Sequence, residues 1–191
     1  MYFIYFLVII NVLTLVEMAY YRRWKQAGVV YYPWLFPVCV VFYVAVNVSA
    51  AAEFFMVERA ISPVAVAAGF ACAFIRFALK YVSAAALGKY WGVHIEIRDN
   101  HELVKSGPFK LLRHPGYLST VFEMLTIPLV ANAWYTLAWV CAGYAVLLYA
   151  RIRLEDNALQ MKFGRQFEDY RKNTAALFPS WSLKQEDFNV N

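Results

Sequence analysis

Five long apolar segments alternate with polar stretches along the chain. They cover about residues 2–20, 34–56, 63–79, 115–130 and 134–150. A membrane-spanning helix needs about 20 mostly apolar residues, so this pattern predicts five transmembrane helices. The third segment is expected to continue as an alanine-rich helix to about Leu87. The first has no basic region before it and no small-residue cleavage site after it, so we interpret it as a retained helix rather than a signal peptide.

Two polar regions complete the pattern. Residues 88–114 are too long for a tight turn, and ordered loops of this length are often functional. From residue 151 to about 172 the pattern predicts an amphipathic helix, followed by a polar tail. Asn132 lies between the last two apolar segments, which predicts a tight helical hairpin there. Pro128 is expected to kink the fourth helix or to end it early.

The composition supports a membrane protein and argues against a soluble domain. Of the 191 residues, 62% are apolar and 16% are charged, whereas soluble domains have about 45–50% and about 25%. The net charge of +5 comes without a basic run typical of nucleic-acid binding. The three cysteines, Cys39, Cys72 and Cys141, lie in apolar segments without CxxC spacing. We therefore expect core residues, with no metal site and no disulfide.

The distribution of basic residues predicts an orientation. Basic residues follow the first, third and fifth apolar segments, whereas the loop after the second has only Arg59 and the loop after the fourth has none. The basic residues after the first, third and fifth segments are Arg22, Arg23, Lys25, Lys89, Arg98, Lys105, Lys110, Arg113, Arg151, Arg153, Lys162, Arg165, Arg171, Lys172 and Lys184. The positive-inside rule then predicts five helices with the N-terminus outside and the C-terminus in the cytoplasm. Both polar regions would lie on the cytoplasmic side, where a site meets soluble cofactors and lipid together.

Candidate chemistry begins where the fourth helix starts. Pro115 suits the first helical position, which places Arg113 and His114 just before the helix and Tyr117 in its first turn. Free N–H groups and the positive end of the dipole favour an anion at such a place. The alternative is an interfacial anchor, in which Arg113 and His114 reach towards lipid headgroups.

A second polar cluster begins where the fifth apolar segment ends. Arg151 and Glu155 are four residues apart and share one face of the predicted helix, which by itself indicates only a solvated pair. The predicted hairpin would bring this cluster close to the start of the fourth helix. A basic helix start, a tyrosine and a carboxylate facing one cavity would suit a zwitterionic small molecule that carries an additional positive charge.

These residues carry a resemblance. The pattern His101-x-Leu-Val-x-x-Gly-Pro-Phe109, followed by Arg113-His-Pro-x-Tyr117, resembles the signature of the isoprenylcysteine carboxyl methyltransferase family. Arg151, Glu155-Asp156 and Phe163-Gly-x-x-Phe-x-x-Tyr170 fit its second half, and the flanking segments 87–91 and 177–179 match as well. The likeness covers about residues 79–179 of a single domain, 1–191, whose first 60 residues match only as apolar spans.

The resemblance implies an all-α integral-membrane methyltransferase that uses S-adenosylmethionine and releases S-adenosylhomocysteine. Arg151 and Glu155 match residues that the family needs for activity. The family's cofactor site carries over to His101, Leu103, Gly107, Phe109, Arg113, His114, Pro115, Tyr117 and Glu155. Three departures stand out: Lys80 where the family often has arginine near the substrate mouth, Asp156 for a second glutamate, and Ser119 for a glycine.

Methyl transfer from a sulfonium needs mainly alignment and exclusion of water. A carboxylate acceptor needs no base, whereas a phenol or enol acceptor would use one, for which Glu155, His101 and His114 are the candidates. Trp91 is expected either to contact the sulfonium or substrate or to belong to an interfacial aromatic belt. With Lys80 and Trp91 we include Glu123 as a substrate-binding candidate, because carboxylates inside membranes are rare and usually functional.

Several functions remain open on the sequence alone. The acceptor is a lipophilic molecule in the bilayer: a prenylcysteine carboxylate, a phenolic or pyrone lipid, or a phospholipid amine. Other classes are a small membrane transport or binding protein, in which Glu17 or Glu123 lines a path, and a membrane reductase that uses a nicotinamide cofactor. The location is the inner membrane of a prokaryote or the endoplasmic reticulum of a eukaryote, with a cytoplasmic active site. Nucleic acid is not an expected partner.

Overall fold

The computed structural model describes residues 2–23 and 26–178, and its framework is a set of six α-helices. Predicted features at Lys25, Pro179 and Lys184 lie outside the described residues. The helices are α1 (Tyr2–Arg22), α2 (Leu35–Met56), α3 (Pro63–Leu87), α4 (Pro115–Ala131), α5 (Trp134–Phe163) and α6 (Arg165–Asn173). Two short 3-10 helices, η1 (Gly88–Tyr90) and η2 (Gly107–Lys110), and two strands, β1 (Val29–Tyr31) and β2 (Ile95–Ile97), lie in the connections.

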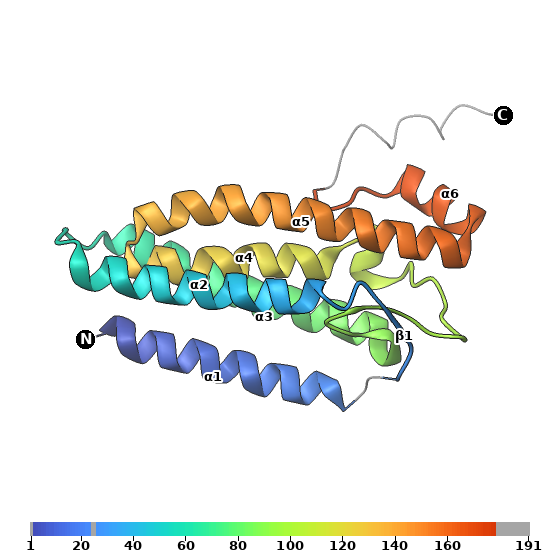
Figure 1. Cartoon of the computed structure of the whole chain (residues 1–191), viewed down its shortest axis with the longest axis horizontal. Helices are drawn as coiled ribbons and strands as arrows, with labels where there is room; N and C mark the ends of the chain where they lie inside the picture. The colour runs from blue at the N-terminus through green and yellow to red at the C-terminus, as the bar shows by residue number, and fades with distance from the viewer. Residues whose placement is uncertain (1, 24–25, 179–191) are drawn as a thin grey trace.

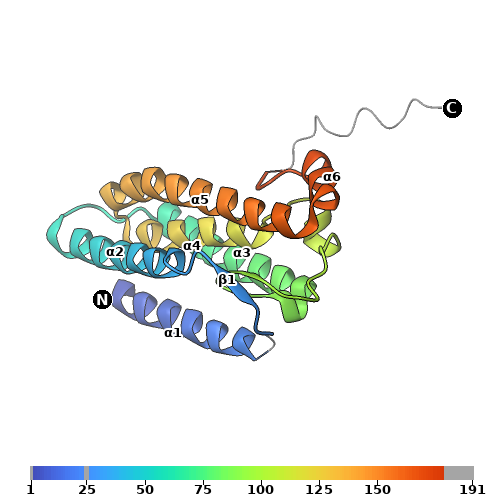
Figure 2. The ribbon, with the colours of Figure 1, turned by 45° about the vertical axis from the view of Figure 1, so that its right-hand side comes forward.

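The first five helices run alternately up and down along one long axis (Figure 1). The α4–α5 hairpin and the α2–α3 connection lie at one end of the bundle. The strands, the segments around them and α6 gather at the opposite end, which we call the polar end (Figures 1 and 2). The two regions that the sequence marked as polar are therefore next to each other in space.

Four helices are long and apolar enough to cross a membrane, judged by length and composition over the described residues: α1, α2, α3 and α5. The fourth predicted span, α4, has 17 residues. Its length is about 25 Å, which is less than the roughly 30 Å of a bilayer's hydrocarbon core. A mostly helical fold with four candidate membrane spans fits the predicted all-α membrane class, whereas the fifth span and the orientation stay predictions.

The two helices α3 and α4 approach each other closely because a glycine faces the contact. A Cβ atom added to Gly69 would lie 2.5 Å from Cγ2 and 2.9 Å from the backbone nitrogen of Val130. Small residues permit such close backbone contacts between membrane helices, where packing replaces the hydrophobic effect. This contact fixes α4 along α3, and with it the start of α4 at the polar end.

The predicted hairpin between α4 and α5 is confirmed. Asn132 ends α4 in the left-handed conformation, at φ 53°, and α4 continues through Pro128 for three more residues instead of ending there. The Asn132 side chain accepts a hydrogen bond from the backbone N–H of Ser62 at 2.7 Å. Arg59 donates to the Asn132 carbonyl at 2.6 Å, which joins this turn to the α2–α3 connection.

Glu53 caps the first turn of α5, and we expect its replacement by alanine to lower the free energy of unfolding by about 2–3 kcal/mol. Its carboxylate accepts from the backbone N–H groups of Tyr135 and Thr136, at 3.1 and 2.8 Å, and pairs with Arg59 at 2.8 Å. Denaturant titration of the detergent-solubilised protein measures the change. Glu53→Gln keeps an acceptor oxygen and should cost less, and unchanged stability of the alanine variant would contradict this role.

The prediction of a separate amphipathic helix from residue 151 is wrong in its start. One helix, α5, continues without interruption from the apolar segment to Phe163. The chain breaks at Gly164, which has φ 52°, a conformation that glycine adopts most readily. The short helix α6 follows and buries Phe167 and Tyr170. The change in polarity at Arg151 marks where α5 leaves its apolar surroundings, not where a helix begins.

Two further differences concern local structure. The strands β1 and β2 pair antiparallel, with Val30 opposite Glu96, although the sequence predicted no strand. This pairing of β1 with β2 links the segment after α1 to the connection after α3. The cysteines are not all core residues, because Cys39 and Cys72 are half-buried and Cys141 is exposed on an apolar helix. Among the described residues no group of histidine, cysteine and carboxylate side chains could hold a metal ion.

Candidate active site

The two predicted polar clusters meet where α4 begins beside α5. Asp156 on α5 joins them, because its carboxylate lies 3.0 Å from a guanidinium nitrogen of Arg113 and 2.9 Å from Nε2 of His114. His114 and Asp156 are both buried. The hydrogen bond and the ion pair hold the start of α4 against α5, so the hairpin does bring these clusters together as predicted.

Tyr117 lies in the first turn of α4, between His114 and Arg151. Its ring stacks on the His114 ring, with 5.3 Å between centroids, and the Arg151 guanidinium lies 4.9 Å from the Tyr117 ring centre. Arg151 also donates to the Val93 carbonyl at 2.6 Å and to the sulfur of Cys39 at 3.0 Å. One guanidinium therefore joins α2, the segment before β2, α4 and α5.

The adjacent carboxylates Glu155 and Asp156 have different surroundings. The Asp156 side chain is 6% exposed and engaged by Arg113 and His114, whereas the Glu155 side chain is 29% exposed. The Glu155 carboxylate lies 3.8 Å from Nδ1 of His114 and is also close to the Tyr117 hydroxyl. Glu155 therefore has carboxylate oxygens that can accept hydrogen bonds from a ligand. Asp156 instead holds Arg113 and His114 in position.

A small cavity of about 100 Å³ adjoins this cluster, and we call it the polar cavity. Five of the predicted cofactor residues line it: His101, Leu103, Phe109, Arg113 and Glu155. The other four predicted residues shape the backbone and packing around it. Gly107 begins η2 at φ 58°, His114 and Pro115 begin α4, and Tyr117 packs on His114.

His101 is held in a stack of aromatic rings. Its imidazole lies parallel to the Tyr90 ring at 4.5 Å, and the Phe163 ring meets it edge-on at 5.7 Å. The buried Nδ1 has no hydrogen-bond partner among the described residues. Burial lowers the pKa of His101 to about 4, and the nearby charges of Arg98 and Lys162 lower it further in the same direction.

This pKa predicts that the protein loses thermal stability as the pH falls from 6.5 to 5. The unfolded chain takes up a proton near pH 6.5, whereas the folded His101 stays neutral until about pH 4. The unfolded state therefore binds more protons in this window, so stability rises with pH and is complete above 6.5. Melting temperatures measured across the window should change less in His101→Phe, which keeps the ring stack. Equal slopes in the variant and the wild type would contradict the assignment.

One expectation about the start of α4 needs correction. The sequence suggested free N–H groups that attract an anion there, yet most of these groups have partners. The backbone nitrogens of Arg113 and His114 donate to the carbonyls of Ala175 and Ala176, at 2.8 and 3.0 Å, and that of Tyr117 donates to the His114 carbonyl. The chain after α6 occupies this position, which a reading of α4 in isolation does not reveal.

A larger cavity of about 660 Å³ lies beside the polar cavity, and we call it the interfacial cavity. Lys80 and Trp91, two of the predicted substrate residues, both line it, together with apolar side chains of α1 and α2. The third, Glu123, does not belong to this lining. It lies inside the bundle, 3.4 Å from the Arg76 guanidinium. Its predicted role in substrate binding stays a prediction.

Two residues at the site were not among the candidates. Asp156, which stands where the family has a second glutamate, orients Arg113 and His114. His94 lines both the polar and the interfacial cavity, as does Gly92. The only signal for His94 in the sequence is a histidine close to Trp91 in a polar connection, which is too weak to select it.

Comparison with known proteins supports the resemblance. The model of the isoprenylcysteine carboxyl methyltransferase (ICMT) family matches residues 67–161. An uncharacterized protein, YpbQ, of Bacillus subtilis is 43% identical over 82 residues, which are 43% of this chain and 49% of that protein. The cobalt-zinc-cadmium resistance protein CzcN of Cupriavidus metallidurans is 35% identical over 103 residues, 53% and 47% of the two chains.

A protein-S-isoprenylcysteine O-methyltransferase of Dictyostelium discoideum is 30% identical over 88 residues, 46% of this chain and 37% of that protein. The matches thus span about half the length, or less, of these curated relatives. The region matched by the family model contains α4, most of α5 and the predicted residues from Lys80 to Glu155. Residues 67–161, about half of the chain, thus match the isoprenylcysteine carboxyl methyltransferase family, and a named methyltransferase of that kind is among the similar proteins.

Proposed function

We propose that the protein is an S-adenosylmethionine-dependent methyltransferase that acts on a lipophilic acceptor entering from the membrane. The observation that carries the proposal is the adjacency of two different cavities at the polar end. The polar cavity has carboxylate, imidazole and guanidinium groups, the interfacial cavity is larger and partly apolar, and His94 lines both. A soluble donor and a lipid acceptor would meet at this boundary.

The side chains of the polar cavity fit the proposed cofactor chemically. Glu155 can accept from an ammonium group or a ribose hydroxyl, and the unpartnered Nδ1 of His101 is available for a further hydrogen bond. The volume of about 100 Å³ is smaller than the roughly 300–1,000 Å³ of ligand sites. We therefore infer that the cavity widens on binding, with residues 101–104, which line one side of it, moving outward.

When bound, the cofactor supplies an activated methyl group on a sulfonium sulfur. The chain's own residues then have three tasks. Glu155 holds the cofactor, Arg151 fixes the wall that contains Val93 and the ring of Tyr117, and Asp156 keeps His114 in place. Alignment of donor and acceptor with exclusion of water supplies most of the rate acceleration for such a displacement.

The charges of the interfacial cavity favour an acceptor that carries a negative charge. Its basic lining residues are Arg22, Arg23 and Lys80, and its apolar ones include Phe36 and Trp91. This combination suits a carboxylate or a phenolate attached to an apolar tail better than an amine. We therefore rank a prenylcysteine carboxylate and phenolic or pyrone lipids above phospholipid amines as acceptors.

The positive charge of Lys80 is only partly neutralised, so it can attract a negatively charged acceptor. Its ammonium lies 3.1 Å from Glu17, but Glu17 is shared with Arg76 at 2.9 Å. A carboxylate acceptor at Lys80 would thus meet a cation that is only partly neutralised. We also propose that the polar end faces the cytoplasm, because basic residues gather there.

Two measurements test the proposal. Titration calorimetry with detergent-purified protein should give micromolar binding of S-adenosylhomocysteine and none of NADPH, which the reductase alternative would require. Labelled methyl groups should then pass from S-adenosylmethionine to N-acetyl-S-farnesylcysteine. Its methyl ester, in which the carboxylate is blocked, is the matched control. A folded sample that binds no S-adenosylhomocysteine would contradict the proposal and direct attention to transport.

A further inference from the structure

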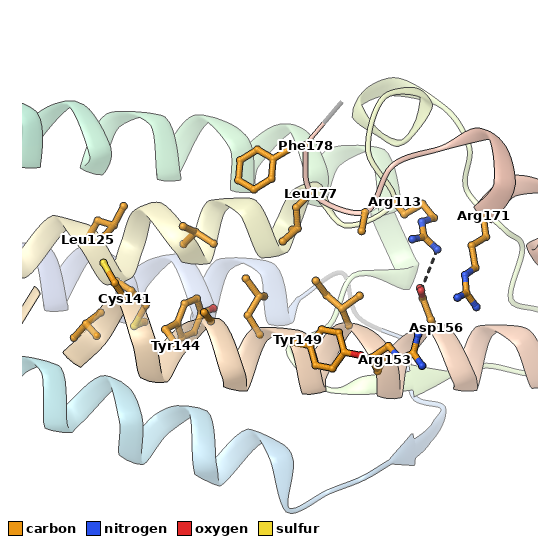
Figure 3. Close-up of a pocket in the computed structure, with 17 residues that line it drawn as sticks. Arg113, Leu125, Cys141, Tyr144, Tyr149, Arg153, Asp156, Arg171, Leu177 and Phe178 are labelled. Atoms are coloured by element: carbon orange, nitrogen blue, oxygen red, sulfur yellow. Dashed lines mark hydrogen bonds and ion pairs between the residues drawn. The ribbon is translucent and has the colours of Figure 1, made fainter. Parts of the chain in front are cut away.

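A long groove separates the outer faces of α4 and α5, and we call it the α4–α5 groove (Figure 3). Its volume is about 730 Å³, within the range of sites that hold small molecules. Residues 176–178 of the C-terminal segment also line it, and Leu177 and Phe178 lie between Leu125 and Arg113 along the groove (Figure 3). Its apolar lining runs along α5 from Val140 to Ile152, with Val121, Met124 and Leu125 facing from α4.

The groove has the length and exposure of a site for a hydrocarbon chain. From Cys141 to Arg153 the helix α5 advances 12 residues, or about 18 Å. Cys141 is exposed, and Tyr149 is 65% exposed, on a helix that is apolar enough to cross a membrane. In a bilayer such exposed apolar side chains contact acyl chains, so the groove is open to lipid along its length.

The polar end of the groove carries an excess of positive charge. Arg113, Arg153 and Arg171 line it with one carboxylate, that of Asp156 (Figure 3). Asp156 is already held by Arg113 and His114. Three arginines share this one carboxylate, so a net positive charge remains for an anion from outside. Among the described residues, Arg153 and Arg171 are the two of these arginines that form no ion pair with Asp156. Guanidinium groups bind phosphate through paired hydrogen bonds, and basic groups near a membrane surface attract anionic lipids.

We propose that the α4–α5 groove binds one anionic glycerophospholipid, with an acyl chain along the groove and the phosphate against Arg153 and Arg171. This site is distinct from the proposed acceptor site, because the groove and the interfacial cavity share no lining residue among those that the structure describes. Arg113 lines both the groove and the polar cavity. The proposal rests on the shape and charge of the groove and does not depend on the proposed methyltransferase activity.

Delipidated, full-length protein in detergent provides the test. Phosphatidylglycerol, added in increasing amounts, should raise the melting temperature and give a one-to-one complex in native mass spectrometry. Phosphatidylcholine with the same acyl chains should bind at least tenfold more weakly. The double variant Arg153→Gln/Arg171→Gln should bind phosphatidylglycerol at least tenfold more weakly than the wild type. The control Arg165→Gln/Lys172→Gln removes the same charge from α6 outside the groove and should bind like the wild type.

A second variant examines the apolar part of the site. Ala145 is exposed and lines the groove, so Ala145→Phe should fill it without disturbing the bundle and should weaken phosphatidylglycerol binding while the lipid-free melting temperature stays unchanged. Equal binding of the two lipids, or wild-type binding by the Arg153→Gln/Arg171→Gln variant, would overturn the proposal. Binding of S-adenosylhomocysteine, measured on the same samples, reports separately on the polar cavity.

Discussion

Replacing Glu155 with glutamine is expected to weaken the binding of S-adenosylhomocysteine by about tenfold to a hundredfold. Hydrogen bonds to a charged group contribute about 1.5–3 kcal/mol, and each 1.4 kcal/mol is about tenfold in affinity. Glu155 lines the polar cavity, and its side chain is the more exposed of the two adjacent carboxylates. The amide keeps the size of the side chain and removes the charge, so the melting temperature should stay close to that of the wild type.

The Glu155 experiment has a matched control on the same part of the chain. Glu168 is an exposed carboxylate on α6 that pairs with Lys172 four residues later, and Glu168→Gln should bind S-adenosylhomocysteine like the wild type. Asp156→Asn should differ from both, because it loosens Arg113 and His114 and lowers the melting temperature. Wild-type affinity in a folded Glu155→Gln sample would remove Glu155 from the proposed cofactor site.

The largest expected loss of stability follows from replacing Arg76 with methionine. Arg76 is completely buried between α1, α3 and α4. It lies 2.9 Å from Glu17 and 3.4 Å from Glu123, and it donates to Thr14 at 2.5 Å. Removing one partner of a buried ion pair costs about 3–5 kcal/mol, because the remaining charge is left uncompensated. Denaturant titration of the detergent-solubilised protein measures this loss.

A double variant separates the charge effect from a simple packing defect. Glu17 keeps Lys80 as a partner at 3.1 Å, so Glu123 is the carboxylate that loses its described partner in Arg76→Met. Arg76→Met/Glu123→Gln should therefore regain a large part of the stability. Arg165→Met, which changes an exposed arginine on α6, should have little effect. If the double variant is no more stable than Arg76→Met, the loss has another cause.

The helices α1 to α4 were predicted within a few residues, because apolar runs bounded by proline, glycine or asparagine leave few alternatives. Pro63 begins α3 and Asn132 ends α4, as the sequence indicated. The strands β1 and β2 were missed because three residues show no reliable alternation. Their pairing joins positions more than 60 residues apart, so it depends on how the helices pack.

The candidate site was predicted in part for a similar reason. The family-like motif identified the residues that meet around Asp156. The predicted hairpin between α4 and α5 indicated that they lie close together. The pairing of Glu17 with Arg76, and the position of His94 between two cavities, depend on contacts between helices that no local pattern encodes. The hydrogen bonds from Ala175 and Ala176 to the start of α4 likewise come from a distant segment.

The continuity of α5 has a mechanical consequence. The helix is continuous between the hairpin and Gly164, so we expect it to behave as one rod about 45 Å long. Its apolar part tilts to match the thickness of the surrounding bilayer. A tilt of roughly 10° about the middle of this rod shifts its far end by about 4 Å. Because Asp156 holds the start of α4 against α5, a change of bilayer thickness is expected to act on the contacts of Asp156 and Glu155 at the polar end.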